Sequence, residues 1–72
     1  MEDKISQKIV EILKKTDEPL ETMEIEKMIP KATRVMVLNR LKDLRGDGKI
    51  KGKRVGAGSK GVWIWWSDSA HR

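Results

Sequence analysis

Apolar residues recur at helical spacing in the first part of the chain. Over residues 3–15 they stand three or four positions apart, as on the buried face of an amphipathic helix. Asp3 is suited to cap the first turn. We therefore predict a helix over residues 3–15 whose apolar stripe belongs to the core. The stripe comprises Ile5, Ile9, Ile12 and Leu13.

The next segment, TDEPLE, interrupts the helical pattern. Pro19 lacks an amide donor and disfavours helix at the residue before it, so we expect Leu20 to be a one-residue strand paired with a later hairpin. Residues 22–29 predict a short helix with Thr22 as its cap, and Pro30 ends it. The inward residues of this helix are expected to be Ile25, Met28 and Ile29, with methionine as a flexible core filler.

A third helix is predicted over residues 32–46. Val37, Leu41 and Leu44 recur at i, i+4 and i+7, and Leu38 widens this stripe. Gly48 follows, where a helix end favours a left-handed residue. A turn of 100° per residue places a second set of residues on the opposite face. That set is Ala32, Val35, Met36, Asn39 and Asp43, flanked by Arg40 and Lys42.

The pattern then changes from helical spacing to strand spacing. IKGKRV, a glycine-rich VGAGSKG loop and GVWIWW predict a β-hairpin, because β-branched and aromatic residues crowd its second strand. Alternation puts Trp63 and Trp65 on one face, and Val62, Ile64 and Trp66 on the other. A domain of 72 residues needs this apolar surface, so we expect at least two of the tryptophans to be substantially buried.

Positive charge is concentrated in one block. Residues 31–61 carry ten Lys or Arg against only Asp43 and Asp47, a net charge of +8. The first thirty residues carry a net charge of −3, and the last eleven are neutral. Such segregation indicates a surface for a polyanion, and for nucleic acid in particular.

Other classes of function find little support in the residues. Cysteine is absent, and His71 stands alone near the end of the chain. VGAGSKG is no phosphate-binding P-loop, because Lys60 is followed by Gly61 and a strand rather than by Ser or Thr and a helix. We therefore expect no enzyme, no cofactor and no metal site. No apolar run approaches the ~20 residues that span a bilayer, so we expect a cytoplasmic protein without a membrane partner, nucleoid-associated if prokaryotic.

The order of these elements has a known parallel. ETMEIEKMIPKATRVMVLNRLKDLRGDGKI resembles the passage from helix 2 to the following strand in winged helix-turn-helix transcription regulators, through Val37, Leu41, Leu44, Gly48 and Ile50. KRVGAGSKGVWIWW is similar to their wing and closing strand. The resemblance implies an α+β fold of three helices followed by a β-hairpin wing, over residues 1–66, with residues 67–72 as a polar tail.

The resemblance also implies a binding mode. The helix of residues 32–46 would enter the major groove of double-stranded DNA, and the wing of residues 51–61 would lie on the backbone or in the minor groove. Asn39 is suited to read adenine and Arg40 guanine. The groove-facing residues would be Thr33, Arg34, Met36, Asn39 and Arg40. The phosphate contacts would come from Lys31, Lys42, Lys51, Lys53, Arg54 and Lys60. We expect a regulator of transcription, as a monomer or a weak homodimer.

Three alternatives stay open at this point. Winged domains also occur in ribosomal and translation proteins, so RNA is a possible partner. The apolar Val35 and Met36 on an otherwise polar helix face suit a protein-interaction module in a larger complex. The tryptophan cluster could stack the bases of a single strand, although such a cluster more often belongs to the core.

Overall fold

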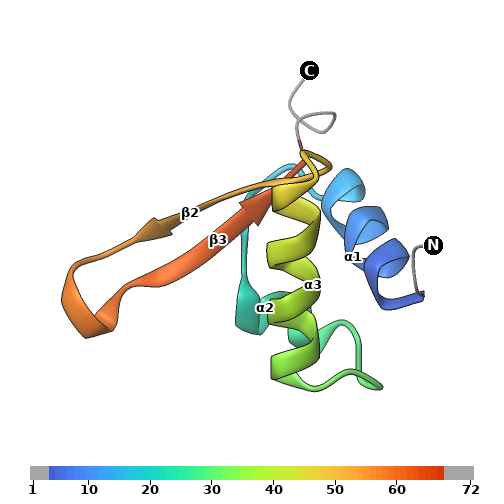
Figure 1. Cartoon of the computed structure of the whole chain (residues 1–72), viewed down its shortest axis with the longest axis horizontal. Helices are drawn as coiled ribbons and strands as arrows, with labels where there is room; N and C mark the ends of the chain where they lie inside the picture. The colour runs from blue at the N-terminus through green and yellow to red at the C-terminus, as the bar shows by residue number, and fades with distance from the viewer. Residues whose placement is uncertain (1–3, 68–72) are drawn as a thin grey trace.

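The computed structural model describes residues 4–67, which form an α+β arrangement of three helices and one three-stranded antiparallel sheet (Figure 1). The predicted order of elements is confirmed. In chain order they are α1 (Lys4–Lys15), β1 (Leu20–Glu21), α2 (Thr22–Lys27), α3 (Arg34–Gly46), β2 (Lys51–Val55), the short 3-10 helix η1 (Gly58–Lys60) and β3 (Val62–Trp66). None of the helices within residues 4–67 has the length and apolarity to cross a membrane.

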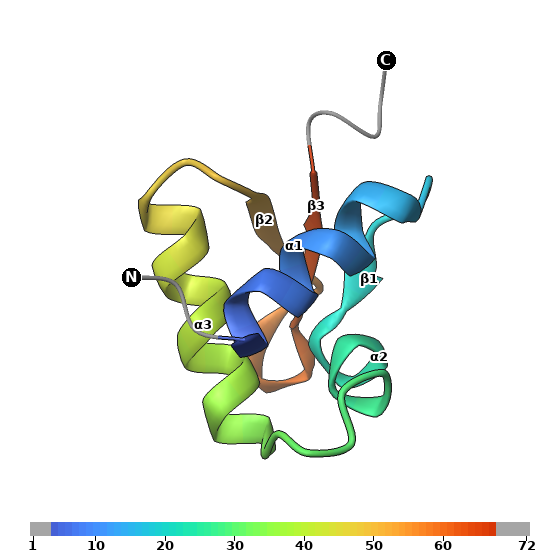
Figure 2. The same ribbon diagram turned by 90° about the vertical axis from the view of Figure 1, so that its right-hand side faces the viewer.

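Helix α1 buries the stripe that its sequence predicts. Ile9 and Leu13 are fully buried, and Ile5, Val10 and Ile12 pack beside them. The helix contacts α3 and β3, and Figure 2 shows it in front of the sheet, between α3 and α2. The predicted cap, Asp3, lies outside the described residues.

Helix α2 begins at Thr22 as predicted, but its N-cap and its C-terminal end differ from the prediction. Its N-cap is Glu21, not Thr22: the Glu21 and Glu24 side chains form a reciprocal capping box. Thr22 is instead buried, where its Oγ1 accepts a hydrogen bond of 2.9 Å from the indole Nε1 of Trp65. A buried indole N–H needs an acceptor, which explains why this threonine turns inward.

The same helix ends at Lys27, two residues before the predicted end, with Met28 as its C-cap. Ile25 and Ile29 fill the inward positions as predicted, but Met28 is 48% exposed. The expectation that Met28 fills the core is therefore wrong. The helix stops before Met28 can complete the stripe, and the two isoleucines already cover that part of the core.

Helix α3 begins at Arg34, two residues later than predicted. Thr33 is its N-cap, because its Oγ1 accepts a hydrogen bond of 3.2 Å from the backbone N–H of Met36. Ala32 therefore lies in the preceding turn, half-buried against the core, and not on a helix face. The apolar stripe is confirmed, since Val37, Leu41 and Leu44 are buried. Gly48 has a φ of 77°, the left-handed conformation predicted beyond the helix end.

The sheet has the order β1-β3-β2, so β3 is its central strand. In the hairpin, Lys51 pairs with Trp66 and Val55 with Val62. On the other edge, Leu20 pairs with Trp65 and Glu21 with Ile64, which confirms the predicted short strand at Leu20 and extends it by one residue.

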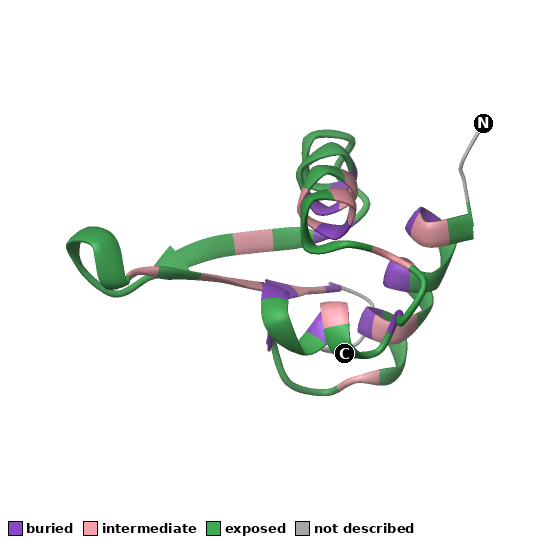
Figure 3. Ribbon diagram, turned by 90° about the horizontal axis from the view of Figure 1, so that it is seen from below, coloured by how far each residue is buried: buried purple, intermediate pink, exposed green. Residues whose placement is uncertain are grey.

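Among residues 4–67, Trp65 is the largest fully buried side chain, 1% exposed, while Trp63 and Trp66 are half-buried. The expectation that at least two of the three tryptophans are substantially buried is met fully by Trp65, and Trp63 and Trp66 are covered in part. Buried residues gather where the helices meet the base of the sheet, whereas the outer half of the hairpin is exposed (Figure 3). Ser67, predicted to begin the polar tail, is also buried, and the rest of that tail lies outside the described residues.

Candidate functional site

The basic block forms an accessible surface on α3, the hairpin and the turns that flank α3. Nine of its ten cations are exposed, and only Arg40 is half-buried. The exposed ones are Lys31, Arg34, Lys42, Arg45, Lys49, Lys51, Lys53, Arg54 and Lys60. A polyanion could therefore reach most of this charge without unfolding any element.

The outward face of α3 is not covered by the rest of residues 4–67. Val35 is 67% exposed, and Asn39, Lys42 and Asp43 are exposed as well. This face is the one that sequence periodicity predicts. Because Asp43 lies on it, a phosphate that approached here would meet one negative charge among the cations.

The five residues predicted to face a groove do not all lie on the same surface of α3. Of the five, only Asn39 is exposed on the outward face and makes no hydrogen bond or ion pair with another residue of 4–67. Met36 and Arg40 are half-buried, at the margin between the outward face and the core. The hydroxyl of Thr33 caps the helix, and Arg34 points elsewhere, as described below. The predicted set is therefore not one continuous reading surface.

The hairpin diverges from α3 after a close approach at its base, near the start of β2 (Figure 1). Strand alternation divides its cations. Arg54 pairs with Trp63 on the face toward the core, whereas Lys51 and Lys53 pair with Trp66 and Ile64 on the opposite face. Arg54 and Lys53 therefore lie on opposite faces of the hairpin, whereas Lys51 borders a shallow hollow together with Arg45 of α3.

Arg45 links α3 to the hairpin, a role that the sequence interpretation missed. Its Nε donates a hydrogen bond of 3.2 Å to the backbone oxygen of Gly52, and its guanidinium lies 5.2 Å from the ring centroid of Trp63. Trp63 in turn stacks on Trp65, with centroids 5.2 Å apart and planes 19° from parallel. The sequence held one indication of this role. Arg45 follows Leu38 by seven positions, so it lies on the same side of the helix as a residue of the apolar stripe.

This stack bears on the alternative of single-strand binding. The rings of Trp63 and Trp65 contact one another, and Arg45 occupies a further part of the Trp63 surface. Trp65 is fully buried. Little of these two aromatic faces is left for a base, so the cluster is better explained as the link between helix and sheet.

Arg54 is engaged within the loop of the hairpin. Its guanidinium donates a hydrogen bond to the backbone oxygen of Gly58, and its Nε lies 2.6 Å from where a Cβ at Gly61 would stand. Gly56 has a φ of 102°, which glycine adopts readily. Arg54, predicted to contact phosphate, therefore also shapes the loop that presents Lys60.

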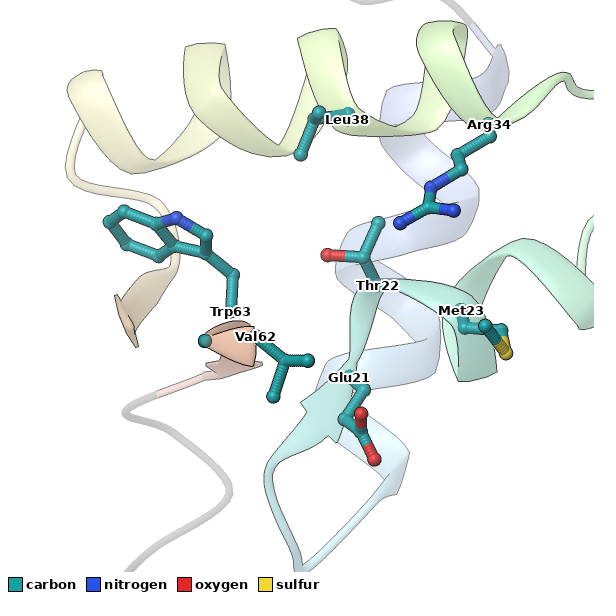
Figure 4. Close-up of a pocket in the computed structure, with 8 residues that line it drawn as sticks. Glu21, Thr22, Met23, Arg34, Leu38, Val62 and Trp63 are labelled. Carbon is teal, nitrogen blue, oxygen red and sulfur yellow. The ribbon is translucent and has the colours of Figure 1, made fainter. Parts of the chain in front are cut away.

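A cleft with a volume of about 160 Å³ lies between α3, the start of α2 and β3 (Figure 4). The guanidinium of Arg34 points into this cleft from α3. Leu38, Val62 and Trp63 supply apolar walls. The residues that line the cleft are Glu21, Thr22, Met23, Arg34, Leu38, Gly61, Val62 and Trp63. No motif in the sequence indicated it, because its walls come from three separate segments.

The acids of the described chain do not gather into a site. Within residues 4–67, no three of the His, Asp and Glu side chains lie together in a way that could hold a metal ion. On α1, Lys15 donates a hydrogen bond of 3.1 Å to Glu11, and this bond lowers the pKa of the Glu11 carboxyl. The pair is exposed, so it adds a little stability above the ordinary pKa of a glutamate and loses it as the pH falls.

Comparison with known proteins gives the chain no relative: no protein-family model, no curated protein and no solved structure matches it.

Proposed function

We propose that this chain is a winged-helix protein that binds double-stranded DNA, with α3 in the major groove and the hairpin as a wing on the neighbouring backbone or minor groove. One observation carries the proposal: the outward face of α3 is uncovered beside a hairpin and turns that hold most of the +8 block. The width of the major groove, about 12 Å, admits a helix of this kind. Regulation of transcription is the biological role that this binding mode suggests.

The arrangement of the elements supports the same proposal. Three helices, a two-residue strand between the first two, and a hairpin after the third are the order expected of a winged helix-turn-helix. The turn between α2 and α3 is short, and α3 packs against both α1 and α2. A helix held this way by Val37, Leu41 and Leu44 can present its opposite face to a partner.

The residues divide into two roles under this proposal. Asn39 is the best-placed base reader, because it is exposed on the outward face and its amide can pair bidentately with adenine. Lys42, Lys53 and Lys60 are exposed cations suited to phosphate. Arg40 stays in the proposal as a second reader, although its half-buried position leaves it less reach.

A salt titration tests the proposal. Labelled duplex DNA of random sequence is titrated with the protein at 50 and 200 mM salt, with anisotropy as the readout. With about six phosphate contacts, the affinity should fall about a thousandfold between the two conditions, because each contact releases counterions. An affinity that does not depend on salt, or that cannot be detected, would contradict DNA binding.

Three variants, measured in the same titration, separate phosphate contacts from base reading. Lys53→Ala should weaken binding to all duplexes alike and reduce the slope of log affinity against log salt by about one. Asn39→Ala should instead change which sequences are preferred. Lys14→Ala, which replaces an exposed lysine on α1 outside the basic block, serves as the matched control and should change neither the affinity nor the sequence preference.

A competition titration with structured RNA separates DNA binding from RNA binding. Stronger competition by the RNA would favour the RNA-binding alternative.

The protein-interaction alternative has one observation in its favour. Val35 is the most exposed of the large apolar side chains in the described residues, at 67%, and it lies on the face proposed for DNA. In the major groove it could contact a thymine methyl group. If duplex DNA perturbs the amide resonances of the hairpin and leaves those of α3 unchanged, a protein partner would be the better occupant of this face.

A further inference from the structure

The cleft of Figure 4 lies between the two elements that the proposed function assigns to neighbouring grooves. Arg34 and Leu38 border it from α3, and Gly61, Val62 and Trp63 border it from the end of the loop and β3. A helix in the major groove and a wing at the adjacent minor groove are separated by one sugar–phosphate strand. If α3 and the hairpin bind in this way, that strand crosses between them, where the cleft lies.

The side chain of Arg34 has no hydrogen bond or ion pair to another residue within 4–67. Two other arginines differ from Arg34, because Arg45 of α3 donates to Gly52 and Arg54 of β2 donates to Gly58. The guanidinium of Arg34 reaches into the cleft with its donors uncommitted (Figure 4). Its five N–H donors match the oxygens of a phosphodiester, which a guanidinium binds bidentately.

The walls of the cleft suit the rest of a nucleotide backbone unit. Leu38 is half-buried, and Val62 and Met23 are 43% and 51% exposed. These apolar surfaces can pack against a deoxyribose, which carries little charge of its own. The hydroxyl of Thr22, whose oxygen accepts the indole N–H of Trp65, borders the cleft as well.

One acid borders the cleft and opposes an anion there. Glu21 stands at its edge, but its carboxylate takes part in the capping box of α2, where it accepts the backbone N–H of Glu24. In Figure 4 the Glu21 carboxylate points away from the guanidinium of Arg34. The cleft therefore has a cationic end on α3 and an acidic end on β1, and an anion belongs at the α3 end.

We propose that this cleft seats a single phosphodiester of the DNA strand that crosses between α3 and the hairpin, with Arg34 as its ligand and Leu38 and Val62 against its sugar. This proposal rests on the proposed function. It changes the role of Arg34 from a reader of bases to a ligand of the backbone. Arg34 then contributes to affinity and to the orientation of α3, and not to sequence preference.

The first experiment follows the cleft directly by NMR. A short duplex is added to the labelled protein, and the Arg34 side-chain Nε–H and the Leu38 and Val62 methyl groups are observed. All three should shift together with the amide of Asn39. If the Asn39 amide and the hairpin amides shift while the cleft groups stay unchanged, the cleft inference is wrong and DNA binding stands. If no resonance shifts, the proposed function fails as well.

The second experiment separates phosphate binding from base reading. Arg34→Gln should weaken every duplex by the same factor, about tenfold for a lost charge-assisted hydrogen bond, and should lower the salt slope by about one. A change in the order of preferred sequences would overturn the inference. The melting temperature of Arg34→Gln should equal that of the unaltered protein, because the Arg34 side chain has no hydrogen-bond or ion-pair partner within residues 4–67. Lys14→Gln is the matched control and should leave affinity and slope unchanged.

Discussion

Trp65 shows how closely single residues depend on one another in this small core. Its indole N–H bonds to Thr22, its ring stacks on Trp63, and its cross-strand neighbour is Gly52. A Cβ built at Gly52 would lie 2.4 Å from Cε3 of Trp65. Glycine is therefore required at position 52 to leave room for the ring, and not to allow an unusual backbone conformation.

The substitution Gly52→Ala tests this close approach. The added methyl group must displace the Trp65 ring or bend β2, so we expect a loss of about 2 kcal/mol in the free energy of unfolding. Urea unfolding followed by tryptophan fluorescence measures it.

Gly46→Ala is the matched control for this loss. Gly46 lies in α3 with nothing within 4 Å of a built Cβ, so alanine there should stabilise the protein by about 0.5–1 kcal/mol. Equal effects of the two substitutions would show that the Trp65 ring does not restrict position 52.

At the scale of elements, the angle between α3 and the hairpin depends on few contacts. Arg45 bonds to Gly52 and lies over Trp63 where the two elements are closest. Beyond this point the hairpin extends away from α3 (Figure 1). Under the proposed function, α3 and the wing must hold neighbouring grooves at once, so Arg45 acts as a positioning residue for both.

We expect Arg45→Leu to loosen the attachment of the hairpin. It removes one hydrogen bond and one cation–π contact at an exposed site, together worth about 1 kcal/mol of the free energy of unfolding. Amide hydrogen exchange should quicken in β2 more than in α1.

Lys42→Leu is the control for this effect, because it removes a charge from the same helix without touching the hairpin. Its effect on stability should stay within about 0.5 kcal/mol. If exchange in β2 is equally fast in both variants, the link through Arg45 does not hold the hairpin.

At the scale of the whole molecule, charge is distributed very unevenly. Residues 31–61 hold a net charge of +8, while residues 1–30 hold −3. Most of the cations are exposed and project from one helix, one hairpin and the turns beside them. Their mutual repulsion opposes folding, and a bound polyanion would relieve it.

Salt should therefore stabilise the protein while it weakens binding to DNA. Between 0.01 and 0.1 M NaCl the screening length falls from about 30 to about 10 Å. We expect the melting temperature to rise by about 4 °C, which corresponds to about 1 kcal/mol of relieved repulsion in a domain of this size. A thermal melt at each salt concentration measures this.

The double variant Lys53→Gln, Lys60→Gln has two fewer positive charges within residues 31–61. The repulsion among the remaining cations is weaker, so salt should raise its melting temperature by a smaller amount. A melting temperature that falls with salt would mean that attractions between the acidic and basic parts of the chain outweigh the repulsion within residues 31–61.

The sequence by itself determined the helices, the hairpin and the location of the charge. These features depend on local order: the spacing of Val37, Leu41 and Leu44, the alternation of Val62–Trp66, and the count of cations along residues 31–61. Its errors were at helix ends, where Glu21 rather than Thr22 caps α2 and where Met28 lies outside the stripe. Competing tertiary contacts, such as that of Thr22 with Trp65, decide between neighbouring caps.

Only the tertiary structure decided which residues meet. Periodicity describes each element alone, so it could not place Arg34 in a cleft with Val62, or Arg45 against Gly52 and Trp63. Nor could it show that Lys53 pairs with Ile64 and Arg54 with Trp63, which depends on the register of the hairpin. The physical reason is that these contacts join segments distant in the chain, and the angles between packed elements are set by side chains from all of them together.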